Sequence, residues 1–85
     1  MTDQHAQQVW DQLRESLEEK LQFGLLDQAR RITAVRIEGD ELVLTTPDDE
    51  AFQFFSAEVN QQRLVIASRS VFVISKVRVE RAAAD

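Results

Sequence analysis

The hydrophobic pattern of this chain changes period part-way along, and this change restricts the fold more than any other feature. In the N-terminal part, large apolar residues recur at the spacing of one helix face: Trp10, Leu13, Leu17 and Leu21. From Thr33 to Thr45, apolar and polar residues alternate, which is typical of strands with one buried face. Within 85 residues, this order of patterns predicts a single α+β domain.

The alternating segment predicts a β-hairpin. Its turn is Glu38-Gly39-Asp40, where glycine adopts a positive φ without steric cost. The apolar side chains expected on the buried face are Val35, Ile37, Leu42 and Leu44. Val43 is expected to point the other way, with Glu41 and Thr45. A third alternating run from Lys76 to Arg81 completes a three-stranded sheet, which we expect to pack on helices.

Two further helical segments flank this hairpin. The apolar cluster from Phe23 to Ala29 predicts a second short helix, separated from the first by a break near Gln22 to Gly24, because glycine is costly inside a helix. After the hairpin, Thr46 is expected to cap another helix, with Pro47 in its first turn. The buried stripe of that helix is predicted to be Phe52, Phe55 and Val59, with Phe54 off to one side.

Residues 61–71 fit both helix and strand. Leu64, Ala67 and Val71 have helical spacing, whereas the β-branched residues of this segment favour a strand. We predict a helix here, followed by a turn near Ser75. The domain is expected to span residues 1–81, with residues 82–85 beginning a linker.

Composition excludes several classes of function. The chain has no cysteine, so disulfides and cysteine metal sites are excluded, and we expect a reducing compartment such as the cytoplasm. Its N-terminus lacks the basic and apolar regions of a secretory signal. The formal net charge of −5 disfavours a general electrostatic grip on phosphates.

No set of residues is arranged for catalysis. His5 is the only histidine and lies in a polar N-terminal segment. The acidic run Asp48-Asp49-Glu50 is explained by the positive end of a helix dipole. We therefore predict a binding module that is not an enzyme, with no catalytic residue, no cofactor and no metal site.

Several segments together resemble the N-terminal domain of the bacterial chromosomal replication initiator DnaA. The matching residues are Val9-Trp10, Phe23 with Leu26, the segment 38–44, Thr46-Pro47 and Val77-Arg78-Val79. The resemblance implies a KH-like fold in the order helix, helix, strand, strand, helix, strand. It also implies a non-catalytic module that recruits the replicative helicase or regulators and supports weak self-association. A related domain of the clamp-loader tau subunit shares the pattern and is the alternative.

The resemblance also suggests contact residues. Gln22 stands where the family often has an acidic residue before the aromatic of its second helix, and Glu50 stands where the family has an aromatic that contributes to helicase contact. Phe52 follows two residues on. The predicted partner-binding residues are Trp10, Gln22, Phe23, Glu50, Phe52 and Phe54.

Trp10, the only tryptophan, has two interpretations. Packing in the core is the favoured one, because tryptophan is large and apolar. The alternative follows from the resemblance, since the family's helix-one tryptophan lies at a self-association surface. The corresponding hypothesis is that part of the ring stays exposed near the start of the helix and supports a weak homodimer.

A weak single-stranded nucleic-acid-binding domain is an alternative of a different class. The residues available for it are Arg30, Arg31, Arg36 and Arg78, on or beside the predicted sheet. The acidic net charge argues against this interpretation.

Overall fold

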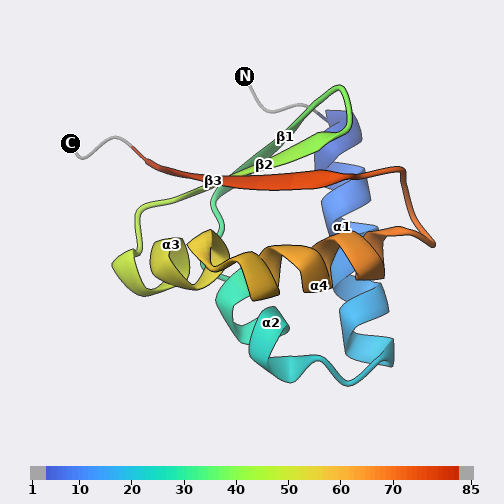
Figure 1. Ribbon diagram of the computed structural model, residues 1–85, viewed down its shortest axis with the longest axis horizontal. Helices are drawn as coiled ribbons and strands as arrows, with labels where there is room; N and C mark the ends of the chain where they lie inside the picture. Colours follow the sequence, from blue (N-terminus) through green and yellow to red (C-terminus); the bar gives the residue numbers. More distant parts are fainter. Residues whose placement is uncertain (1–3, 83–85) are drawn as a thin grey trace.

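A three-stranded sheet with helices on one side forms the body of the protein. The structure is a computed structural model that describes residues 4–82. Its elements are α1 (Gln4–Glu19), α2 (Phe23–Ala29), β1 (Ala34–Glu38), β2 (Glu41–Thr46), α3 (Asp49–Ser56), α4 (Glu58–Ser68) and β3 (Lys76–Arg81). Figure 1 shows α3 and α4 below the sheet, α2 below them, and α1 crossing at the right. The predicted α+β class is confirmed. Two helices lie between β2 and β3, as the residue patterns predicted, whereas the order implied by the resemblance has one.

The sheet is mixed, with β2 in the centre. β1 pairs antiparallel with β2, and β3 pairs parallel with β2 on its other side. The predicted hairpin is confirmed, with Val35 opposite Leu44 and Ile37 opposite Leu42. Gly39 in the turn has a φ of 65°, a conformation that disfavours residues with a side chain. The third strand has the bounds that the sequence predicted.

Helix α1 ends earlier than the apolar spacing predicted. Leu13 and Leu17 are fully buried, but Leu21 lies beyond the helix end at Glu19 and is 71% exposed. The break therefore covers residues 20–22, and Gly24 lies inside α2 rather than in the break. No side chain of the first helix continues the stripe past Leu17.

The link from β2 to α3 also differs from the prediction. Thr46 is the last residue of β2 and does not cap α3, because its hydroxyl donates to the Arg31 carbonyl at 2.7 Å and accepts from the Asp48 N–H at 3.1 Å. Asp48 is the N-cap, and its side chain accepts a hydrogen bond from the Ala51 N–H at 2.9 Å. Pro47 thus precedes the helix instead of opening it.

Helices α3 and α4 are separated at Ala57, which is extended. The break is stabilised by α4 side chains that satisfy carbonyls near the end of α3: Asn60 donates to the Phe54 carbonyl and Gln61 to the Phe55 carbonyl. Because of this break, Val59 leaves the predicted buried stripe and is 57% exposed. Phe55 keeps its predicted place in the core and is fully buried.

Candidate functional site

A groove of about 750 Å³ lies between α1 and α2. Phe23 and Leu26 form its apolar lining. Its charged lining includes four carboxylates, from Asp11, Glu15, Glu18 and Asp27, and two arginines, Arg14 and Arg30. Arg14 is already paired with Asp11 at 2.9 Å. The groove therefore combines an apolar wall with a surplus of negative charge.

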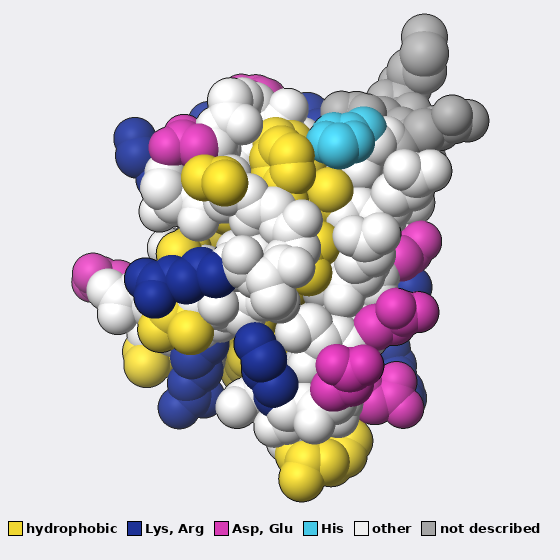
Figure 2. Space-filling model, turned by 90° about the vertical axis from the view of Figure 1, so that its right-hand side faces the viewer, with side chains coloured by type: hydrophobic (Ala, Val, Ile, Leu, Met, Phe, Trp, Pro, Cys, Tyr) yellow, Lys and Arg dark blue, Asp and Glu magenta, His cyan; other side chains and the backbone are white. Residues whose placement is uncertain are grey.

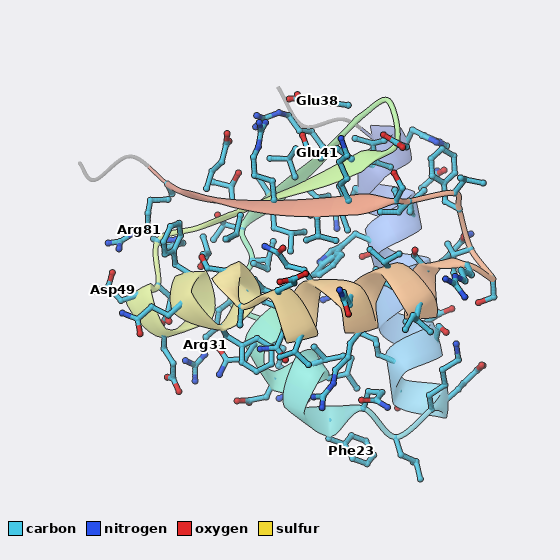
Figure 3. All side chains as sticks on the ribbon, viewed as in Figure 1. Phe23, Arg31, Glu38, Glu41, Asp49 and Arg81 are labelled. Carbon is cyan, nitrogen blue, oxygen red and sulfur yellow. The ribbon has the colours of Figure 1, made fainter. Side chains whose placement is uncertain are left out.

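Two large apolar side chains stand exposed at the end of this groove. Leu21 is 71% exposed and Phe23 is 59% exposed, and we call the pair the Leu21–Phe23 corner. Figure 3 shows the Phe23 side chain at the foot of α2, pointing away from the body of the molecule. Exposed apolar side chains that lie beside each other in this way are typical of sites that bind other proteins.

The backbone of the turn that forms this corner adopts a Schellman motif. The Leu21 N–H donates to the Glu18 carbonyl, and the Gln22 N–H donates to the Leu17 carbonyl. This motif places Leu21 in the left-handed region, with a φ of 59°. Glycine usually occupies that position, because a side chain there costs about 1–2 kcal/mol. A leucine that is both exposed and unfavourable for the backbone points to selection for something other than stability.

Gln22 joins the corner, whereas Trp10 does not. Gln22 is exposed as the N-cap residue of α2 and makes no side-chain capping hydrogen bond. Trp10 is 2% exposed, so the hypothesis of a partly exposed ring is wrong. The segment after α4 packs against the start of α1, with the ring centroids of Phe72 and His5 5.2 Å apart, and covers the end of the helix that appeared open.

The remaining predicted partner residues lie on α3, and none of them lines the groove. Glu50 is held in an ion pair with Arg31, with a nitrogen-to-oxygen distance of 2.5 Å. The Phe52 ring lies 5.6 Å from the Arg81 guanidinium carbon. Phe54 is half-buried and packs edge-on against Phe55, with ring centroids 5.1 Å apart. The structure therefore does not bring these residues together with Phe23.

Three of the four arginines considered for nucleic-acid contact are paired with carboxylates. Arg31 reaches Asp48 and Asp27 as well as Glu50. This pairing raises the pKa of Arg31, chiefly through the hydrogen bond to Glu50. Arg30 forms no ion pair with residues 4–82 and lines the acidic groove.

Arg36 and Arg78 lie on the outer face of the sheet within one ionic network. Arg36 binds Glu38 at 2.5 Å and Glu80 at 3.0 Å, and Arg78 lies 3.5 Å from Glu38. The hydrogen bond from Arg36 holds the pKa of Glu38 below its usual value. These guanidinium groups are matched internally, so little positive charge remains to attract phosphates.

Comparisons with protein-family models, curated proteins and solved structures found no match for this chain. Within residues 4–82, no group of three or more histidine and acidic side chains is placed to hold a metal ion. In the same range, no helix is both long enough and apolar enough to cross a bilayer.

Leu21 is the site residue that sequence reasoning missed. It has the spacing of the buried stripe, so periodicity alone assigned it to the core. A signal was nevertheless present, because Glu18 to Lys20 are three consecutive charged residues and a helix that ends there leaves the next apolar residue outside the core.

Proposed function

We propose that this chain is a non-catalytic docking domain that binds another protein through the Leu21–Phe23 corner and the acidic groove beside it. The observation that carries the proposal is the exposed leucine with a φ of 59°, next to an exposed phenylalanine. By its resemblance to the initiator N-terminal domain, the partner is the replicative helicase or a replication regulator. The related clamp-loader domain remains the alternative within the same class.

The chemistry of the groove suggests what the partner must present. Aromatic side chains that insert into a partner's pocket often supply most of the binding energy of an interface, and Phe23 is the exposed aromatic of this corner. The surplus of carboxylates along α1 and α2 favours a partner surface with lysine or arginine around an apolar pocket. Association should then weaken as salt is added, because rim charges are screened.

Binding to single-stranded nucleic acid is supported less well than binding to protein. Arg31, Arg36 and Arg78 are each paired with carboxylates. Self-association through Trp10 is not proposed, since that ring is buried.

Two substitutions at the corner test the proposal without a large loss of stability. Leu21→Gly should raise the free energy of unfolding by up to about 1 kcal/mol, because glycine removes the backbone cost. Phe23→Ala should change stability by less than about 0.5 kcal/mol, because the ring is mostly exposed. Both variants should weaken binding to the purified replicative helicase by about tenfold or more, measured by titration calorimetry.

Gln53→Ala is the control, because Gln53 is an exposed residue on α3 that belongs neither to the corner nor to the groove. It should leave helicase binding unchanged. If the unchanged protein does not bind the helicase at micromolar concentrations, the assignment of the partner is wrong. If it binds and both corner variants bind equally well, the corner is not the interface.

A further inference from the structure

The exposed face of α4 carries two large apolar side chains among polar and charged ones. Leu64 and Ala67 are buried on its inner side, while Val59 is 57% and Ile66 is 56% exposed on the other. A helix turns about 100° and rises about 1.5 Å per residue, so these two side chains project within about 20° of each other and about 10 Å apart. We call this line of the helix surface the ridge. Gln62 and Arg63 lie between its two apolar side chains, which no part of residues 4–82 covers.

Two arginines flank this ridge without an internal partner. Arg63 lies between Val59 and Ile66 along the helix, and Arg69 follows the helix end. Neither forms an ion pair with residues 4–82, whereas Arg14, Arg31, Arg36, Arg78 and Arg81 all do. Glu58, the only acidic residue of α4, lies in its first turn and accepts from the Gln62 side chain. Positive charge is therefore locally unmatched, although the chain as a whole is acidic.

The ridge continues toward a hollow at the C-terminal end of α4. This hollow has a volume of about 400 Å³, and its lining includes Val65, Phe72 and Val73 together with Arg69. Val73 is 80% exposed, the largest exposure among the large apolar side chains of the described residues. Figure 2 faces this side of the molecule and shows apolar side chains beside the histidine and basic side chains nearby. The hollow is large enough to receive one apolar side chain of a partner next to a cation.

We propose that this face of α4 is a second docking surface and that its occupant is an acidic amphipathic helix of another protein. The spacing of seven residues between Val59 and Ile66 matches the apolar repeat of a helix packed alongside. Arg63 and Arg69 select glutamate or aspartate at the flanks of that apolar repeat. This surface is separate from the Leu21–Phe23 corner, so the proposal does not depend on the function proposed for that corner.

The charge pattern favours an acidic helix over nucleic acid. Arg63 and Arg69 offer arginine planes on which bases can stack, but the exposed valine and isoleucine beside them give a base no such plane. The net charge of −5 opposes any acidic partner, and only an acidic helix offsets this repulsion by apolar contact with Val59 and Ile66 in addition to two ion pairs. A nucleic acid has no apolar side chains that could cover the ridge.

A designed peptide tests the proposal with the full chain. The probe is a fluorescent peptide of three heptads with leucine at positions a and d and glutamate at e and g, which stays monomeric through charge repulsion. It should bind with a micromolar dissociation constant in fluorescence anisotropy, and the same peptide with lysine at e and g should not bind. Arg63→Glu and Ile66→Ala should each weaken binding by about tenfold.

The matched control is Arg81→Glu at the end of β3, which changes the net charge by the same amount at an exposed site outside both proposed docking surfaces. It should leave the affinity for the peptide nearly unchanged. Circular-dichroism melting curves should show that Arg63→Glu and Ile66→Ala keep the fold, as expected for exposed positions.

Three results would overturn the proposal. One is equal binding of the glutamate and lysine peptides, since charge would then not be selected. Another is an equal loss of affinity in Arg81→Glu and Arg63→Glu, because only net charge would matter. The third is no peptide binding together with tight, salt-sensitive binding of single-stranded DNA that Arg63→Glu abolishes, which would assign the face to nucleic acid.

Discussion

The two faces of the sheet bury residues equally well by different means. On the inner face, Leu42 and Leu44 are fully buried in the main core cluster with side chains of the surrounding helices. On the outer face, Val43 is also fully buried, but it does not belong to that cluster. Its neighbours across the sheet are Arg36 on β1 and Arg78 on β3.

The arginine side chains explain why the outer face stays closed. Cross-strand neighbours project to the same face, so the aliphatic stems of Arg36 and Arg78 lie on both sides of Val43. Their guanidinium groups are held by Glu38, Glu41 and Glu80. The prediction that Val43 points to the polar side was therefore correct in direction, but ion-paired side chains bury it. Equal burial does not imply equal stabilisation, because the stems remain mobile and the ion pairs face water.

The largest loss of stability should come from a substitution on the inner face. Leu44→Ala should lower the free energy of unfolding by about 2–4 kcal/mol, because the residue is fully buried and the surrounding helices cannot collapse into the cavity. Val43→Ala should cost less, about 1–2 kcal/mol, because arginine stems can settle into the space. Urea denaturation of both variants checks the difference. Equal losses would mean that the outer face behaves as a second rigid core.

A substitution of Thr46 tests a buried polar residue on the inner face. Thr46→Val keeps the shape of the side chain but leaves the Arg31 carbonyl and the Asp48 N–H without their hydroxyl partner. Both groups are partly buried, so we expect a loss of about 1–3 kcal/mol in the free energy of unfolding. Thr46→Ser, which retains the hydroxyl, is the control and should lose less. If Thr46→Val left the free energy of unfolding unchanged, the stability of the inner face would depend on side-chain shape alone.

The smallest loss of stability should come from a substitution in the ionic network of the outer face. The size of this loss should depend on pH. The pKa of Glu38 is lowered in the folded protein by the hydrogen bond from Arg36, so the folded state favours the ionised carboxylate. This contribution is present above the unfolded pKa of about 4.3 and is lost as the pH falls through the folded value.

Arg36→Gln should therefore reduce stability slightly at neutral pH and leave stability less sensitive to acid. Urea denaturation of both proteins between about pH 7 and pH 3 measures this, and the two curves should converge at the acid end. If the free energies of unfolding of the two proteins differed by the same amount at every pH, Arg36 would stabilise the fold through its aliphatic stem alone. Added salt should also narrow the difference at neutral pH, since exposed ion pairs are screened.

Local signals predicted most of the elements correctly. The hairpin register, the turn at Gly39 and the bounds of β3 follow from alternation and turn chemistry, which act between neighbours in the chain. The errors lie at helix ends. Leu21 has the right spacing for the core, but the Schellman turn that ejects it depends on where the helix stops. Thr46 has the right chemistry for a cap, but the strand uses its hydroxyl elsewhere.

The predictions for the candidate site were likewise correct for one residue and wrong for another. The resemblance suggested a surface role for both Phe23 and Trp10, and the structure leaves Phe23 exposed but buries Trp10. The difference arises because the segment carrying Phe72 and Ile74 returns over the start of α1 from far along the chain. Periodicity reports which side of an element is apolar, whereas contacts between distant segments decide whether that side is covered. The sequence alone thus determined the class, the sheet and its faces, and only the tertiary structure decided that the corner at Leu21 and the ridge of α4 stay open.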